Sequence, residues 1–247
     1  MEIVANALSK GFGPRQAVYA VDLHIAAGEI YGLLGANGAG KTTTLRMLAG
    51  LMRPSSGHAA ICGFDVLRTS QQAKAMVGFL TSSTGLYLRL TPRELLTYFG
   101  KFYGLTRANL PARIDGLSRM FGIEHLLDRQ CGGLSNGEKQ RISLARAMIH
   151  NPPVLILDEP MSGLDIFARR FVTDFIRYAR SHGRAILFST HYMAEAELIC
   201  DRIGVLHHGR MLRQSTPLEL KTEMRAQSLE EAFLRLIDST SAKGNPA

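Results

Sequence analysis

The chain has 247 residues, 46% of them hydrophobic and 20% charged, and its 29 lysines and arginines outnumber its 21 acidic residues to give a net charge of +8. This composition excludes a disordered chain, whose signature is high charge with few apolar residues. The 24 glycines follow no G-X-Y period, which excludes collagen. Apolar runs all fall short of the roughly 18 residues that a membrane helix needs. We therefore expect a soluble globular chain of one large domain or two small ones.

Charge and cysteine content narrow the class of protein further. A basic chain can bind nucleic acid, an anionic membrane surface or a nucleotide. Because the basic residues are scattered and form no run of five or six, we favour a solvated surface over nucleic-acid binding. The three cysteines are odd in number and lack C-x-x-C spacing, which indicates reduced core thiols in a cytoplasmic protein. The N-terminus shows no signal-peptide pattern.

Glycines and prolines divide the chain into segments of strand and helix length. In chain order, the apolar patterns first predict strands at 17–25 and 29–34 and a helix at 42–51. A long helical region follows at 92–150, and it includes a helix at 137–149. Strands then alternate with helices; the strands are 154–158, 185–189 and 203–206, and the helices are 167–180 and 192–200. Such alternation favours an α/β fold with a parallel sheet covered on both faces. The helical middle region is predicted to be an insertion, and residues 238–247 a flexible tail.

A phosphate-binding loop is predicted between the second strand and the first helix. The segment fits G-x-x-x-x-G-K-[ST] at every fixed position, and its residues are Gly35, Ala36, Asn37, Gly38, Ala39, Gly40, Lys41 and Thr42. Glycines let backbone N–H groups curl around a phosphate, and a helix N-terminus adds further donors. Lys41 is predicted to contact the β- and γ-phosphates of ATP, and Thr42 to ligate Mg²⁺. We include Thr43 in the nucleotide-binding set.

Two acids follow the predicted strand 154–158. In open α/β sheets ligands bind at the carboxyl ends of the strands, where Asp158 and Glu159 are placed. We expect Asp158 to hold Mg²⁺ and Glu159 to orient or deprotonate an attacking water. The alternative, that two acids merely end a strand, is less favoured because a phosphate loop precedes them.

Further motifs resemble those of ATP-binding cassette (ABC) ATPases. The segment 134–141, LSNGEKQR, resembles the family signature L-S-G-G-Q but departs from it at Asn136 and Glu138. It keeps Ser135 and Gly137, which in the family touch the γ-phosphate held by the opposite subunit. The segment 162–165, SGLD, is similar to the family's D-loop, and His191 to its switch histidine, which implies a catalytic set of Lys41, Glu159 and His191. Phe12 stands where the family has an aromatic that stacks on adenine, although Tyr19 is nearby.

This resemblance covers about residues 3–236 and implies an ABC nucleotide-binding domain over 2–237. Its fold would be an α/β P-loop NTPase with a RecA-like core, an antiparallel β subdomain near the N-terminus and a helical subdomain at about 85–150. The exporter branch that works with ABC-2-type permeases is the most similar, and residues 85–94 look most like sodium-extruding ATPases. Ser82 occupies the slot of the family's Q-loop glutamine, from which it would reach Mg²⁺ only through a water, as a weak ligand.

The resemblance therefore implies an ATP-hydrolysing subunit, a translocase, that drives a separately encoded ABC-2-type permease. Two copies would sandwich two ATP molecules at the cytoplasmic face of the inner membrane, and no nucleic-acid partner is expected. Two alternatives stay open: an ABC ATPase that acts on nucleic acid or the ribosome, and a weakly hydrolysing nucleotide-binding regulator, suggested by Ser82 and the altered signature. The sequence leaves the exported substrate open among sodium, drugs, lipids and polysaccharides.

Overall fold

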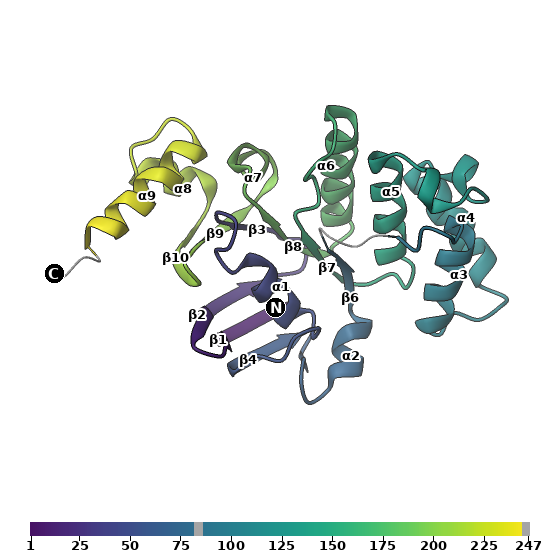
Figure 1. Ribbon diagram of the computed structural model, residues 1–247, viewed down its shortest axis with the longest axis horizontal. Coiled ribbons are helices and arrows are strands. Elements are labelled where there is room, and N and C mark those ends of the chain that lie inside the picture. The colour runs from purple at the N-terminus through teal and green to yellow at the C-terminus, as the bar shows by residue number, and fades with distance from the viewer. Residues whose placement is uncertain (82–85, 244–247) are drawn as a thin grey trace.

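The computed structural model describes residues 1–81 and 86–243, and within them ten strands pair into one sheet in the order β5-β4-β1-β2-β10-β9-β3-β8-β7-β6 (Figure 1). Five central strands pair in parallel; they are β3 (Ile30–Leu34), β6 (Val77–Leu80), β7 (Val154–Asp158), β8 (Ala185–Thr190) and β9 (Arg202–His207). Every residue of β3, β7 and β8 is buried, as their continuous apolar sequences indicate. β10 (Arg210–Ser215) then returns antiparallel to β9.

The N-terminal strands form an antiparallel layer, as the family resemblance implied. These strands are β1 (Ile3–Phe12), β2 (Arg15–Ile25), β4 (Ser56–Ile61) and β5 (Phe64–Asp65). One bridge, between Tyr19 of β2 and Arg210 of β10, joins this layer to the central strands. The α/β P-loop fold is thus confirmed, with an antiparallel part that the alternation of strands and helices alone did not predict.

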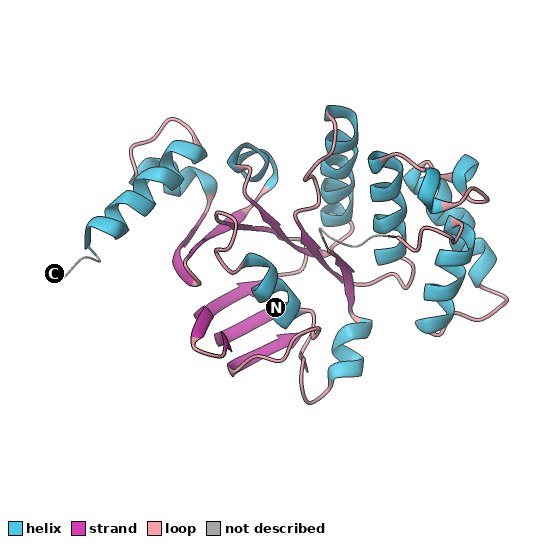
Figure 2. Ribbon diagram, viewed as in Figure 1, coloured by secondary structure: helices cyan, strands magenta, loops and turns pink. Residues whose placement is uncertain are grey.

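Helices cover both faces of the central strands (Figures 1 and 2). On one face α1 (Lys41–Leu48) packs between the central strands and the antiparallel layer, in a core that includes Val154 and Ile156. The alternate residues Leu155 and Leu157 face a second core, formed with α5 (Asn136–Ala147) and α6 (Ile166–Ser181). This alternation explains why β7 is apolar at every position before Asp158.

The middle of the chain is helical, as expected. It contains α3 (Pro92–Phe102), α4 (Leu110–Phe121), the short 3₁₀ turns η1 (Glu124–Leu126) and η2 (Cys131–Gly133), and α5; the short α2 (Ser70–Ala75) precedes β6. A capping box between Thr91 and Glu94, with a proline in the first turn, starts α3. Gly122, in a left-handed conformation, ends α4.

Three helices follow β8, and the last extends into the segment that was predicted to be a flexible tail. They are α7 (Met193–Ile199), α8 (Pro217–Glu223) and α9 (Leu229–Lys243). The expected tail begins at residue 238, yet α9 continues to Lys243. The hydroxyls of Ser239 and Thr240 donate to the carbonyl of Leu236, which lets small polar residues remain in the helix.

Candidate nucleotide-binding site

The loop between β3 and α1 has a backbone that only glycine accommodates at key positions. Gly38 and Gly40 have φ angles of +81° and +105°, a left-handed region that L side chains rarely adopt. A Cβ on Gly40 would lie 2.7 Å from the carbonyl oxygen of Ala17 on β2. The glycines therefore let the loop pass close to β2 and present the N-terminus of α1 to the space in front of it.

A cavity of about 580 Å³ lies at this loop, and thirteen residues line it: Phe12, Arg15, Gln16, Ala17, Tyr19, Asn37, Gly38, Gly40, Lys41, Thr42, Thr43, Glu159 and His208. Eight of these were predicted as site residues from the sequence. Arg15, Gln16, Tyr19 and His208 come from β2 and from the turn after β9, so only the fold brings them here. The cavity combines cationic, hydroxyl and aromatic groups, which suits an anionic nucleotide.

The ammonium group of Lys41 lies against the phosphate-binding loop. Its buried Nζ donates to the carbonyl oxygens of Gly35 and Ala36, at 2.7 and 3.2 Å, and lies 3.3 Å from Oε1 of Glu159. The ammonium group is thus already placed where a phosphate on the loop would contact it. Gly35 and Ala36 serve this geometry through their carbonyl groups.

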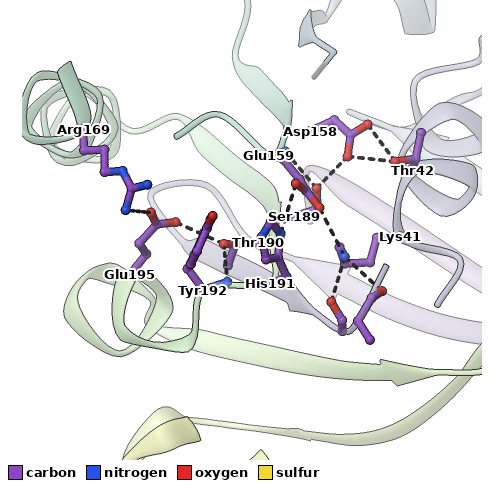
Figure 3. A network of polar contacts seen from close by, with 12 residues as sticks. Lys41, Thr42, Asp158, Glu159, Arg169, Ser189, Thr190, His191, Tyr192 and Glu195 are labelled. Carbon is purple, nitrogen blue, oxygen red and sulfur yellow. Dashed lines mark hydrogen bonds and ion pairs between the residues drawn. The ribbon is translucent and has the colours of Figure 1, made fainter. Parts of the chain in front are cut away.

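A buried cluster of oxygens lies at the end of β7 (Figure 3). Thr42 Oγ1 donates to the two carboxylate oxygens of Asp158, at 3.1 and 2.8 Å. Asp158 is fully buried and also accepts a 2.6 Å hydrogen bond from the hydroxyl of Ser189. These bonds compensate the burial of the carboxylate. Ser189 was part of a sequence motif, but its own role could not be predicted.

Glu159 is held in a strained conformation beside His191. Its φ angle of +47° is uncommon for a residue with a side chain, and such strain gathers at functional sites. The hydroxyl of Ser189 accepts a 3.0 Å hydrogen bond from the Glu159 N–H. On its other side, Glu159 Oε2 lies 3.1 Å from Nδ1 of His191. The structure therefore brings together Lys41, Glu159 and His191, which the sequence assigned to catalysis.

Two aromatic residues line the outer part of the cavity. Phe12 is 49% exposed, and the Lys10 ammonium lies 5.3 Å from its ring centroid. The ring of Tyr19 is covered by the guanidinium of Arg210, at 4.2 Å. Because its ring carries no such close cover, Phe12 has more surface available to a planar base.

The signature segment lies apart from this cavity. Ser135 caps the N-terminus of α5: its Oγ accepts from the N–H of Glu138, whose side chain accepts from the N–H of Ser135. This hydrogen bond lowers the pKa of the Glu138 carboxyl. Ser135 and Gly137 line a separate depression of about 320 Å³, together with Asp165 and Phe167. The departure from the family pattern at Glu138 thus forms a capping box.

Other contacts tie the site to neighbouring helices. Gln140 of α5 donates a 2.5 Å hydrogen bond to the carbonyl of Pro160, next to Glu159. Within the described ranges, 1–81 and 86–243, no three His, Cys, Asp or Glu side chains cluster as a metal site. The predicted weak ligand Ser82 lies outside those ranges.

A loop of this geometry, with an acidic strand end beside it, defines a P-loop nucleotide-binding protein. The ABC transporter family model matches residues 18–162. The ABC transporter ATP-binding protein NatA of Bacillus subtilis is 40% identical over 220 residues, which cover 89% of each chain. The chain therefore belongs to the ABC transporter family, as an ATP-binding subunit that hydrolyses ATP.

Other comparisons agree with this assignment. The Nod factor export ATP-binding protein I of Paraburkholderia xenovorans is 39% identical over 86% of this chain and 70% of its own length. A solved ATP-binding subunit of an ABC transporter superposes with a TM-score of 0.88 and 31% identity, over 96% of this chain and 100% of that one. The chain thus falls within an exporter branch of the family. None of the helices in the described part of the chain is long and apolar enough to cross a membrane.

Proposed function

We propose that this chain energises export through a separately encoded ABC-2-type permease, at the cytoplasmic face of the inner membrane. The proposal rests on a cavity lined by Lys41, Thr42 and Glu159, in a member of an exporter branch. Asp158 contacts Thr42 and His191 contacts Glu159 directly behind this lining.

In this site each side chain has a separate task. Phe12 stacks on adenine, while Lys41 and the N–H groups of the loop bind the phosphates. Glu159 orients the attacking water and accepts its proton, and His191 holds the Glu159 carboxylate through its Nδ1 contact.

Thr42 and Asp158 are suited to hold Mg²⁺. They present a hydroxyl and a carboxylate whose oxygens lie 2.8–3.1 Å apart, and hard oxygen donors are the ligands that Mg²⁺ takes. Mg²⁺ bound there would neutralise charge on the β- and γ-phosphates. Serine at position 82 leaves the Q-loop slot without its glutamine, so we propose at most a weak, water-mediated contribution from Ser82.

A second copy of the chain completes each site. Within one chain, Ser135 and Gly137 line a depression that is separate from the cavity of Lys41. In an ATP-sandwich dimer, the N-terminus of α5 of one copy would instead meet the γ-phosphate held by the other. The capping box keeps this terminus ordered, so the altered signature does not favour a regulator without turnover.

The permease is proposed to bind near residues 86–93 and α3. Four exposed apolar side chains lie on this part of the chain: Tyr87, Leu88, Tyr98 and Phe102. Exposed apolar groups that gather on one region mark sites of protein interaction. Sodium is the substrate that the resemblance of residues 85–94 favours, although the permease would determine the selectivity.

Reconstitution tests this proposal. The chain and a candidate ABC-2-type permease would be co-purified and placed in proteoliposomes, and ATP-dependent transport of ²²Na⁺ measured. We expect transport, and weaker co-purification of the Phe102→Ser variant, while Leu234→Ser on the exposed face of α9 serves as the matched control. Equal co-purification of both variants would contradict the docking surface. ATP-dependent transport of a different substrate would contradict the assignment of sodium as the substrate and leave the export function intact.

A further inference from the structure

The polar network around Glu159 does not end at His191 (Figure 3). Thr190 and Tyr192 flank this histidine, and the Tyr192 N–H donates a 2.9 Å hydrogen bond to Thr190 Oγ1. Thr190 Oγ1 in turn donates to Glu195 Oε2 on α7, at 3.0 Å. The carboxylate of Glu195 therefore holds the loop that carries His191 through its hydrogen bond with Thr190.

Glu195 itself depends on a cation from another helix. Its Oε1 is buried and accepts no hydrogen bond from the described part of the chain, and it lies 3.8 Å from Nη1 of Arg169 on α6. Burial raises the pKa of this carboxyl, and the nearby guanidinium opposes that rise. A buried carboxylate with one open oxygen needs its counter-ion close by, because desolvation otherwise disfavours the charged form.

Arg169 also contacts the turn that precedes α6. Its Nε donates a 2.9 Å hydrogen bond to the carbonyl of Leu164, and its guanidinium lies 5.0 Å from the ring centroid of Tyr192. The Tyr192 ring lies 4.1 Å from the ring of His191. The Arg169 side chain therefore contacts the turn 162–165, the ring of Tyr192 and the carboxylate of Glu195. Glu195 in turn accepts from Thr190, on the other side of His191.

The turn 162–165 is placed to sense a second copy of the chain. Asp165, at its end, lines the same depression as Ser135 and Gly137. In the proposed dimer this depression faces the nucleotide of the partner. A shift of the turn on dimer closure would move the Leu164 carbonyl and, with it, the Arg169 guanidinium.

We propose that Arg169 and Glu195 are positioning residues that couple the turn 162–165 to His191 and hold the histidine in its contact with Glu159 when the dimer closes. This inference rests on the proposed roles of His191 and Glu159. Neither positioning residue contacts the cavity that receives ATP. Their loss should therefore slow turnover and leave the affinity for ATP unchanged.

Steady-state ATPase assays with matched variants test this inference. We expect Glu195→Gln and Arg169→Gln each to lower kcat by about ten-fold or more and to change KM for ATP by less than about two-fold. Arg169→Lys should also lower kcat, because a single ammonium cannot hold both the Leu164 carbonyl and Glu195. This milder variant keeps the test open should Arg169→Gln fold poorly.

The chain offers a control for each variant. Glu197 lies two residues beyond Glu195 on α7 but pairs with Lys221. Arg170 follows Arg169 but pairs with Asp174 on the exposed side of α6. Glu197→Gln and Arg170→Gln should keep kcat within about two-fold of the parent, as expected for pairs outside the network.

A double-variant cycle separates positioning from a general effect on structure. If Glu195 acts through His191, Glu195→Gln should cause no further loss in a His191→Ala background. If the double variant loses more kcat than His191→Ala alone, this inference is wrong while the proposed role of His191 stands. The same holds if Glu195→Gln keeps the parental kcat and His191→Ala does not. A parental kcat for His191→Ala would instead overturn the proposed role of His191, and the inference with it.

Discussion

Removal of the Ser189 hydroxyl tests how the buried carboxylate at the end of β7 is stabilised. This hydroxyl donates to Asp158 at 2.6 Å and accepts from the Glu159 N–H at 3.0 Å, and both Asp158 and Ser189 are fully buried. Ser189→Ala leaves the carboxylate with one donor fewer and the N–H without its acceptor. A hydrogen bond to a charged group contributes roughly 1.5–3 kcal/mol, and an unsatisfied buried group costs roughly 1–3 kcal/mol. We expect Ser189→Ala to lower the free energy of unfolding by about 2.5–6 kcal/mol.

Urea unfolding of parent and variant measures this loss, and Ser143→Ala provides the control. Ser143 is also buried, but its hydroxyl donates to the neutral carbonyl of Lys139 within α5. Its removal should cost about 1 kcal/mol or less. Because Ser189 also holds the backbone of Glu159, the kcat for ATP should fall in Ser189→Ala and not in the control. An equal loss of stability in the two variants would show that the Ser189 hydroxyl does not stabilise the buried Asp158 carboxylate.

Three further predictions follow from the site and its surroundings. Lys41→Ala should weaken ATP binding roughly 10- to 150-fold, measured by calorimetric titration, because a charge-assisted contact contributes about 1.5–3 kcal/mol; an unchanged affinity would contradict the phosphate-binding role. Burial lowers the pKa of His150 from 6.5 to about 4, so the unfolded chain takes up a proton that the folded chain does not. The free energy of unfolding should therefore fall by about 3 kcal/mol as the pH drops from about 6.5 to 4, and His150→Phe should flatten this dependence in urea titrations; an equal slope in both proteins would exclude His150 as its source. A mixture of Ser135→Arg and Lys41→Ala chains should regain one intact composite site and part of the ATPase rate that each variant lacks alone, whereas no recovery in demonstrated heterodimers would argue against sites formed between copies.

The phosphate loop and the acidic strand end could be predicted from the sequence because each is short and contiguous. The phosphate loop from Gly35 to Thr42 needs glycines at fixed spacing, since a side chain at Gly40 would collide with β2. The run 154–157 is apolar at every position because cores lie on both of its faces. In both segments the local pattern alone carries the physical constraint.

The antiparallel layer is less visible in the sequence. β1 contains polar residues such as Asn6, Ser9 and Lys10, and its pairing with β2 is interrupted by register shifts that break the alternation of apolar residues. β10 is largely polar as well. Only the resemblance to a known family indicated such a layer.

Contacts between distant segments could not be predicted either. Glu138 looked like a departure from the signature, yet it completes the cap on Ser135. Arg169 and Glu195 meet because α6 and α7 follow neighbouring parts of the same sheet, and their rotamers decide the contact. The directions of these side chains cannot be predicted from their spacing in the sequence.

A comparison of Glu159→Gln with the parent protein shows whether the Glu159 carboxylate is required for hydrolysis. The amide keeps the shape of the carboxylate but cannot accept the proton of the attacking water. ATP affinity, measured by titration, and ATPase rate, measured by phosphate release, would be determined on the same purified preparations, with Glu197→Gln as the control. We expect Glu159→Gln to retain ATP binding, to hydrolyse ATP at a rate close to background, and to form a homodimer that ATP traps and light scattering detects. Hydrolysis by Glu159→Gln at close to the parental rate would contradict the proposed role of Glu159.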